Sequence, residues 1–351
     1  MKCTTTNLSF LELGPIGNKE GKNSEVFLAK DIQLNAELVV KKMEINKFED
    51  IDEYFLEARM LYENRHPNIM EIQYASRDEN YIYLSMPYHK KGSINSLIEK
   101  RFLSVREIIK YSLDVLSGVA YIHSKGLVHL DIKPTNILLD KSDRAILTDF
   151  GLSRYLDEYG IANQQCNYIP HIDPEWFATS GRTVLSDIYQ IGLTLYRLCN
   201  GNDILKKQMA ALNINTEERL KEVVVGGIYP DREQFLPHVP IKLRKIIKKA
   251  LEVDTTKRYN NVIQLMNDLS EVEQNLDWIF TNNPEELYYL VKNNNKISIK
   301  VEHINGKSKI LCTKTNLSSG RVTKMNKYCS SGHTSNDDIK KQIEKIIKDN
   351  N

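Results

Sequence analysis

Two short stretches carry most of the information about the fold: His129-Leu130-Asp131-Ile132-Lys133-Pro134-Thr135-Asn136 and, further on, Asp149-Phe150-Gly151. Asp149 follows Asp131 by 18 residues (149 − 131). The carboxylate of Asp149 and the amide oxygen of Asn136 are ligands of the kind that Mg²⁺ prefers. Asp131 offers a second carboxylate, which can orient an acceptor hydroxyl and take its proton, and Lys133 can offset charge on a phosphoryl group. Phosphoryl transfer depends mainly on such positioning and charge neutralisation, so these residues suit that chemistry.

The composition around these stretches is that of an ordinary globular protein. The chain has 351 residues, 41% of them hydrophobic and 27% charged, and a formal net charge of +2, which excludes a wholly disordered chain. No apolar run is long enough to span a bilayer, and the first residues lack the apolar core of a signal peptide. The five cysteines include no C-x-x-C pair, which favours a reducing compartment. We therefore predict a cytoplasmic protein with no membrane contact.

The pattern of apolar residues changes twice along the chain, which predicts an α+β protein in three parts. Residues 9–89 predict a small strand-rich lobe with one helix, residues 90–275 a larger helical lobe, and residues 276–351 a small α+β appendage. The elements expected in the two lobes are strands at 24–29, 37–43 and 81–86 and helices within 49–64 and at 105–123, 185–199 and 243–251.

The appendage has its own pattern and a basic composition. Residues 292–296 predict a polar linker or turn, Asn305-Gly306 predicts a hairpin turn, and Ser335 or Asn336 can cap a last helix. Residues 292–351 hold 13 Lys and Arg against 5 Asp and Glu, a local balance of +8 (13 − 5). Such a module can meet nucleic acid, an acidic partner or the protein's own acidic surface, but a solvated lysine-rich surface is the first interpretation. Phe280, Tyr288 and Tyr289 are expected to pack it onto the helical lobe.

Taken together, the two stretches that open this section resemble the motifs of the eukaryotic-type (Hanks-type) protein kinases. The resemblance covers about residues 9–275 and implies the bilobal protein-kinase fold, with ATP and Mg²⁺ (or Mn²⁺) as cofactors. It implies Asp131 as the catalytic base and Lys133 as a neutraliser of charge. Asn136 and Asp149 would then be the metal ligands.

The same resemblance implies a nucleotide site built mainly by the N-terminal lobe. Lys41, in Leu38-Val39-Val40-Lys41, would reach the α- and β-phosphates, and Glu57 would hold Lys41 through a salt bridge. Gly21 and Ser24 stand where the family has glycines that cover the phosphates, with Lys19 or Gly17 as the first position. The residues implied for the adenine pocket are Met86 as gatekeeper, Pro87 and His89 with their backbone groups, and Val26, Val39 and Leu138 as walls.

Further motifs favour a kinase that acts on proteins. Asp173-Pro174-Glu175 stands where the family has A-P-E, and Asp187 begins a match to its D-x-W-x-x-G helix. Arg258 matches the arginine that pairs with the A-P-E glutamate, here Glu175. Small-molecule kinases of the antibiotic-phosphorylating kind share the first stretch but lack this downstream set, so that alternative is disfavoured.

Two departures bear on regulation and specificity. Leu130 replaces the arginine of H-R-D, which pairs with a phosphorylated activation segment in the family, so we predict that phosphorylation of this segment is not the main on-switch. Lys133 is typical of serine/threonine-specific members, whereas Tyr168 replaces a threonine that usually precedes A-P-E. The sequence thus predicts a serine/threonine protein kinase that acts on protein substrates, including itself. The alternative is a pseudokinase scaffold that binds nucleotide or partners without turnover.

Overall fold

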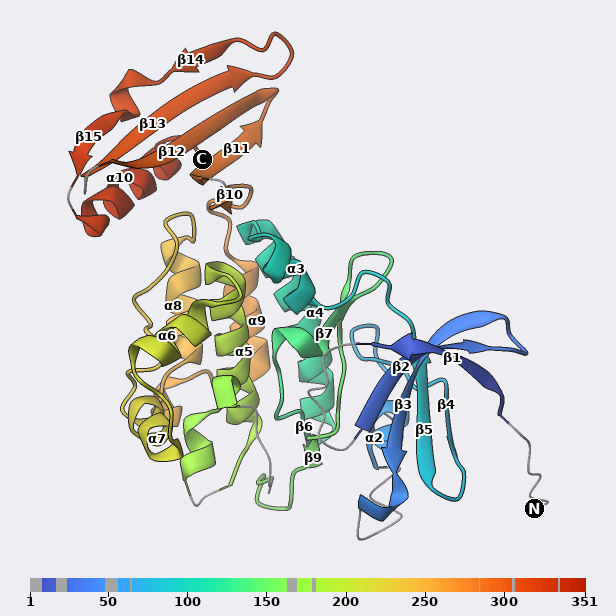
Figure 1. Cartoon of the computed structure of the whole chain (residues 1–351). Coiled ribbons are helices and arrows are strands. Elements are labelled where there is room, and N and C mark those ends of the chain that lie inside the picture. The colour runs from blue at the N-terminus through green and yellow to red at the C-terminus, as the bar shows by residue number, and fades with distance from the viewer. Residues whose placement is uncertain are drawn as a thin grey trace.

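The structure is a computed structural model that describes residues 8–16, 24–47, 56–63, 65–162, 169–178, 181–283, 285–304, 307–333 and 335–351. These residues form a strand-rich N-terminal lobe, a helical lobe and a C-terminal appendage (Figure 1). The α+β architecture predicted from the sequence is therefore confirmed. The appendage lies over the end of the helical lobe where α3 (Ile94–Lys100) and α8 (Ile241–Ala250) are seen, at the top of Figure 1, and apart from the N-terminal lobe.

The N-terminal lobe is a five-stranded antiparallel sheet in the order β1-β2-β3-β5-β4. Alternate residues of β2 are buried, as the two-residue repeat of a strand requires, whereas in β3 the adjacent residues Val40 and Lys41 are both buried. The strands predicted at 24–29, 37–43 and 81–86 are confirmed, and the predicted helix is present as α2 (Leu56–Glu63). The strands of the lobe are β1 (Phe10–Pro15), β2 (Ser24–Asp31), β3 (Ala36–Glu44), β4 (Tyr74–Arg77) and β5 (Tyr81–Pro87).

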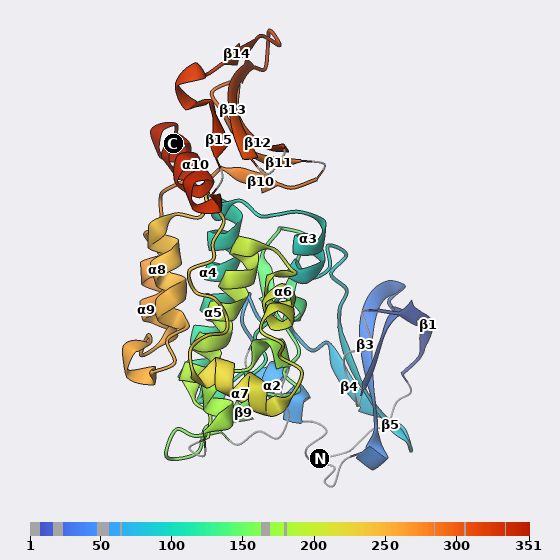
Figure 2. The same ribbon diagram turned by 60° about the vertical axis from the view of Figure 1, so that its left-hand side comes forward.

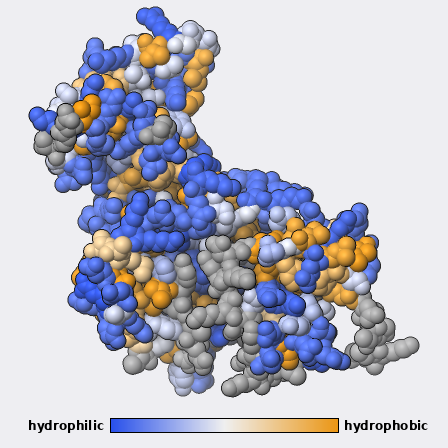
Figure 3. Space-filling model, in the orientation of Figure 1, coloured by the Kyte–Doolittle hydropathy of each residue, from blue (hydrophilic) through white to orange (hydrophobic). Residues whose placement is uncertain are grey.

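The outer surface of this lobe is unusually apolar. Figure 3 shows hydrophobic side chains gathered over the N-terminal sheet, whereas the appendage is largely hydrophilic on the same face. The exposed apolar residues of β1 and of the turn after β2 are Leu11, Leu13, Ile32 and Leu34. In the described sheet β1 is an edge strand, so these apolar side chains stand beside backbone groups that have no strand partner among the described residues.

The helical lobe is built around α4 (Val105–Ser124) and α5 (Val184–Asn200). Helix α4 begins at a capping box, in which Ser104 accepts a bond from the backbone of Glu107 and the Glu107 side chain accepts one from the backbone of Ser104. Helix α5 is buried along almost its whole length. The remaining helices are α3 (Ile94–Lys100), α6 (Ile204–Ala211), α7 (Glu217–Val225), α8 (Ile241–Ala250) and α9 (Val262–Ser270).

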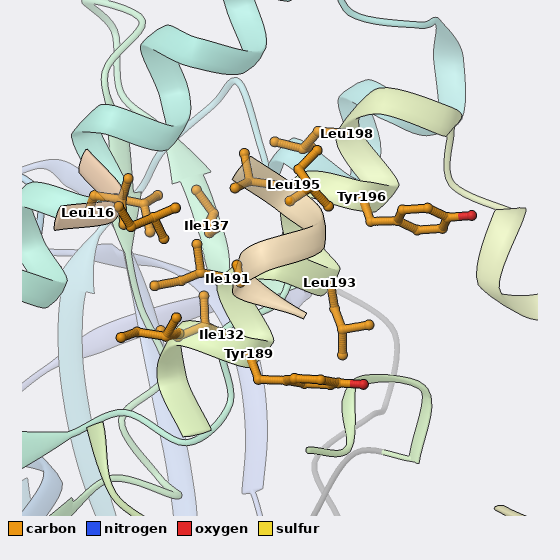
Figure 4. Packing of buried hydrophobic residues seen from close by; sticks show 14 of the residues in the cluster. Leu116, Ile132, Ile137, Tyr189, Ile191, Leu193, Leu195, Tyr196 and Leu198 are labelled. Atoms are coloured by element: carbon orange, nitrogen blue, oxygen red, sulfur yellow. The ribbon is translucent and has the colours of Figure 1, made fainter. Parts of the chain in front are cut away.

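The buried helix α5 supports the loop that carries the first motif. Figure 4 shows Ile132 of that loop and Ile137 of the following strand beside Ile191 of α5. Because α5 lies in the core of the helical lobe, these apolar contacts fix the position of the loop against that core. The short strands that flank the two motifs are β6 (Leu127–Val128), β7 (Ile137–Leu139), β8 (Ala145–Leu147) and β9 (Arg154–Tyr155).

The appendage is a six-stranded antiparallel sheet with one helix on one face (Figure 2). Apolar residues of the strands and the isoleucines Ile339, Ile343, Ile346 and Ile347 of the helix form a separate core. The elements are β10 (Ile279–Thr281), β11 (Glu286–Lys292), β12 (Asn295–Ile304), β13 (Lys307–Asn316), β14 (Val322–Lys324), β15 (Ser330–His333) and α10 (Asn336–Asp349).

The predicted turn residues of the appendage can now be assigned. Lys292 pairs with Asn295, and Asn293 and Asn294 have positive φ values of 48° and 58°, so this segment is a tight hairpin turn and not a linker. Ser335, not Asn336, caps the last helix by accepting a bond from the Asp337 backbone. The Asn305-Gly306 prediction lies outside the described residues, although β12 and β13 pair up to its two ends.

Aromatic rings hold the appendage on the helical lobe. Phe280 packs edge-on against Phe102, with 4.6 Å between ring centroids, and both Phe280 and Tyr288 lie against the buried ring of His238. The packing predicted for Phe280 and Tyr288 is therefore confirmed. The prediction for Tyr289 was wrong, because adjacent strand residues face opposite sides of a sheet and Tyr289 lies on the side away from this contact.

Among the described residues, none of the helices combines the length and the apolar character that crossing a membrane requires.

Candidate active site

The loop of the first motif is held by polar side chains of α5. The carboxylate of Asp187 accepts hydrogen bonds from the backbone N–H groups of His129 (2.9 Å) and Leu130 (2.7 Å). Gln190, one turn further on, accepts from the Ile132 N–H at 2.9 Å and donates to the Leu130 carbonyl at 2.8 Å. All four backbone groups are thus satisfied in a buried region, which rigidifies the loop. Asp187 was predicted from its motif, whereas the role of Gln190 was not predicted.

Asp131 lies in this loop, with one carboxylate oxygen bound to two side chains and the other without a hydrogen-bond partner among the described residues. Its Oδ2 accepts from Asn136 Nδ2 at 2.8 Å and lies 3.0 Å from Lys133 Nζ. Its Oδ1 is buried and has no hydrogen-bond partner among the described residues. Burial raises the pKa of Asp131, and Lys133 opposes that shift. A buried acceptor without a partner is costly, so this oxygen is suited to receive a donor from a bound molecule.

Asp149 and Lys41 meet across the boundary between the two lobes. Lys41 Nζ of β3 lies 3.1 Å from Asp149 Oδ1, and the Asp149 side chain is 49% exposed while Lys41 is nearly buried. The lysine lowers the pKa of Asp149, which keeps the carboxylate charged. Phe150 is buried edge-on against His129, with 4.8 Å between ring centroids, and this contact fixes the residue next to Asp149. The Glu57 side chain lies outside the described residues, so its pairing with Lys41 stays a prediction.

The two predicted metal ligands come from loops that are bonded to each other. The backbone N–H of Thr148 donates to the carbonyl of Asn136 at 2.9 Å, which links the strand before Asp149 to the first motif. An amide oxygen from Asn136 and a carboxylate from Asp149 form a hard oxygen donor set that fits Mg²⁺ or Mn²⁺. With only two protein ligands, such an ion would take its remaining ligands from water and from the phosphates of a nucleotide.

The residues predicted for the adenine pocket lie together between the lobes. Val39 pairs with Met86 across the sheet, and Met86 packs in one apolar cluster with Val39 and Leu138. Met70 and Ile146 belong to the same cluster and were not predicted, because neither lies in a recognisable motif.

The remaining residues predicted for the nucleotide site lie on β5, on β2 and in the loop after β5. Pro87 ends β5 opposite Leu38, and the carbonyl of His89 accepts from the Gly92 N–H at 3.0 Å. Ser24 begins β2, and Val26 stands two residues further along that strand, opposite Lys41. The predictions for Gly21, Lys19 and Gly17 lie outside the described residues.

The segment around Asp173-Pro174-Glu175 is anchored to the helical lobe by a buried ion pair. Arg258 Nη1 lies 2.5 Å from Glu175 Oε1 and donates to the carbonyl of Leu185 at 2.6 Å. The Arg258 side chain has no exposed surface, and that of Glu175 is 11% exposed. The pairing that the resemblance to the kinase family implied is therefore present.

Replacing Arg258 by methionine is expected to lower the free energy of unfolding by about 3–5 kcal/mol, because the Glu175 charge would be left buried without its partner. The measurement is chemical denaturation followed by circular dichroism. Arg219→Met is the matched control, since its partner Glu222 is mostly exposed and such pairs contribute less than about 1 kcal/mol. Equal losses for the two variants would contradict the assigned role of the buried pair.

The structure has a strand-rich lobe and a helical lobe. The charged groups of Lys41, Asp131 and Asp149 and the amide of Asn136 gather where the two lobes meet. Residues 11–269 match the family model described as the protein kinase domain. The chain therefore belongs to the protein kinase family, as its motifs indicated. Membership of this family implies the use of ATP with a divalent metal ion.

Curated relatives with similar sequences are serine/threonine kinases from bacteria and a kinase from humans. The chain is 29% identical over 257 residues to the probable serine/threonine-protein kinase PknB of Lactococcus lactis, a match that covers 71% of this chain and 40% of that protein. It is 28% identical over 255 residues to the serine/threonine-protein kinase PrkC of Bacillus subtilis (71% and 38%). It is 26% identical over 246 residues to human 3-phosphoinositide-dependent protein kinase 1 (68% and 42%). The chain thus spans well under half of the length of these relatives.

Proposed function

We propose that the chain is an active protein kinase that transfers the γ-phosphoryl group of MgATP to serine or threonine hydroxyls of proteins, including its own. The observation that carries the proposal is the buried Oδ1 of Asp131, which has no partner among the described residues. A substrate hydroxyl bound there would donate to this oxygen and lose its proton to it as the phosphoryl group is transferred.

Each of the other site residues has a role in the proposal. Lys41 would bind the nucleotide phosphates, and Asn136 and Asp149 would hold Mg²⁺ between them. Lys133, which lies 3.0 Å from Asp131, would offset negative charge on the transferred group. The group from ATP would move in line from the leaving oxygen to the substrate oxygen, with little covalent participation by the protein.

The preference for serine and threonine has two supports. Lys133 stands at a position that is typical of serine/threonine-specific members, and the relatives from Lactococcus and Bacillus carry serine/threonine-protein kinase in their names. Tyr168, which lies outside the described residues, is the feature of the sequence that argues against it.

The second candidate function is a pseudokinase scaffold. It is favoured by the departures in the phosphate-covering loop, where Ser24 stands in place of a glycine. It is opposed by the presence of Lys41, Asp131, Asn136 and Asp149, since a scaffold that does not catalyse transfer has no chemical need of all four. Turnover decides between the two functions.

The test is transfer of labelled phosphate from ATP to the protein itself and to a generic basic protein, with Mg²⁺ or with excess EDTA. We expect label on phosphoserine or phosphothreonine with Mg²⁺, and a loss of at least about 10³-fold with EDTA, because metal neutralisation of the phosphates contributes several kcal/mol. Restoring Mg²⁺ is the control for reversibility. ATP binding without any label transfer would favour the scaffold, and label only on tyrosine would contradict the proposed specificity.

A further inference from the structure

The activation segment, defined here as residues 149–175, ends in a run where alternate residues each meet a buried arginine. His171, Asp173 and Glu175 all point into the helical lobe. His171 and Asp173 are fully buried, and Glu175 is partly exposed. His171 Nε2 lies 3.1 Å from Arg197 Nη1, and Glu175 pairs with Arg258 as described above. Burial lowers the pKa of His171, so its contact is with a neutral ring, whereas Asp173 and Glu175 form ion pairs.

The partner of Asp173 is Arg182, and their contact is bidentate. Arg182 Nε donates to Asp173 Oδ2 at 3.2 Å, and Arg182 Nη2 donates to Asp173 Oδ1. The Arg182 residue is 3% exposed and Asp173 is fully buried. A fork of two parallel bonds fixes direction as well as distance, which a lysine at this position would not do.

The backbone of the same arginine holds an earlier part of the activation segment. Ala162 N–H donates to the Arg182 carbonyl at 2.7 Å, and Arg182 N–H donates to the Ala162 carbonyl at 3.1 Å. Arg182 therefore binds position 162 through its main chain and position 173 through its side chain. Two points of the segment that are 11 residues apart (173 − 162) are tied to one residue.

Leu130 completes this arrangement with apolar contacts. It is fully buried and packs with Val128 and Ala162 in one cluster, against which Leu156 and Val184 are also packed. An arginine at position 130 would place a charge among these buried apolar side chains, and such a charge would need an oppositely charged partner. Here Ala162 is held by a hydrophobic contact and two backbone bonds, none of which requires a phosphate.

We propose that Arg182 is a positioning residue that holds Ala162 and Asp173 of the activation segment in the arrangement that accepts a protein substrate, without phosphorylation of that segment. The inference rests on the proposed kinase function for its kinetic consequences, but not for its structural ones. In this proposal the fork on Asp173 also orients the backbone between Asp173 and Glu175, against which a protein substrate would bind. Nucleotide binding, which uses Lys41 and Asp149, lies outside this contact.

The test uses the full chain after phosphatase treatment, with intact mass to show that no phosphate remains. We expect wild-type transfer to stay within about twofold of the untreated protein. Arg182→Gln is expected to lower kcat/KM for a protein substrate by roughly 30-fold or more, through KM for that substrate, with KM for ATP unchanged. Arg106→Gln is the matched control, since its bidentate pair with Asp277 is exposed by more than half on both sides.

Amide hydrogen exchange gives a second readout that does not need activity. The amides of Ala162 and Arg182 are expected to be protected in the dephosphorylated wild type and to exchange at least about tenfold faster in Arg182→Gln, while those of α5 remain protected. Asp173→Asn should speed the exchange of the same amides by a similar factor. The double variant should exchange no faster than the faster of the two single variants, because the two side chains act as one unit.

Loss of wild-type transfer on dephosphorylation, with ATP still bound, would overturn the inference, and so would an Arg182→Gln protein with unchanged exchange and unchanged KM. A protein that transfers no phosphate in either state but shows the expected exchange pattern would contradict the proposed function and support the role of Arg182.

Discussion

Replacing Asp149 by alanine is expected to lower the rate of phosphoryl transfer by at least about 10³-fold. Asp149 is the charged, half-exposed carboxylate at the junction of the lobes, and the proposed metal loses its only carboxylate ligand in this variant. A divalent ion contributes several kcal/mol to stabilising charge on a transferred phosphoryl group, and about 4 kcal/mol corresponds to 10³-fold. The measurement is the initial rate of labelled phosphate transfer at saturating MgATP.

Asp143→Ala is a closely matched control for this prediction. Asp143 also has a positive φ (64°, against 63° for Asp149) and also pairs with lysines, Lys91 and Lys110, but it lies outside the site. Both variants place alanine in a left-handed conformation, so they should lose similar stability through backbone strain. Only Asp149→Ala should lose transfer. A comparable loss of rate in both variants would show that the effect comes from strain and not from the metal.

Replacing Asp131 by asparagine is expected to lower kcat by about 10²–10⁴-fold, with little change in ATP affinity. Asparagine has the same shape, so the contacts of Asn136 and Lys133 with position 131 can persist, but the group can no longer accept a proton from the substrate hydroxyl. General-base catalysis by a positioned side chain contributes an effect of this size. The measurements are kcat under saturating conditions and ATP affinity by calorimetry.

Asp114→Asn serves as the control for the same chemical change elsewhere. Asp114 is a half-buried carboxylate that accepts from the Ala145 N–H at 2.9 Å, and burial raises its pKa as it does for Asp131. It stands on α4 away from the site, so its variant should keep kcat within a few-fold. If Asp131→Asn kept its kcat as well, Asp131 would not be the base.

The sequence determined the class of protein because its chemistry sits in short, ordered segments. Asp131, Asn136 and Asp149 are close in the chain, and their residue types, together with the resemblance to the kinase motifs, predicted a shared metal and acceptor site. In the structure, the bond between Thr148 and Asn136 links the two segments that carry these residues. Strand alternation and helical periodicity are also local properties, so β2, β3, β5, α4 and α5 could be predicted. In the appendage, the two strands on either side of the predicted Asn305-Gly306 turn, β12 and β13, could be predicted as well.

Only the tertiary structure decided the contacts that join residues far apart in sequence without a motif. Nothing in the sequence indicated that Gln190 would satisfy the backbone of the Asp131 loop, or that Arg182 would meet both Ala162 and Asp173. Glutamine and arginine are usually surface residues, and their side chains become structural only when folding buries them beside unpaired polar groups. For the same reason Tyr289 could not be distinguished from Tyr288, since which face of a strand is covered depends on what packs against the sheet and not on the strand itself.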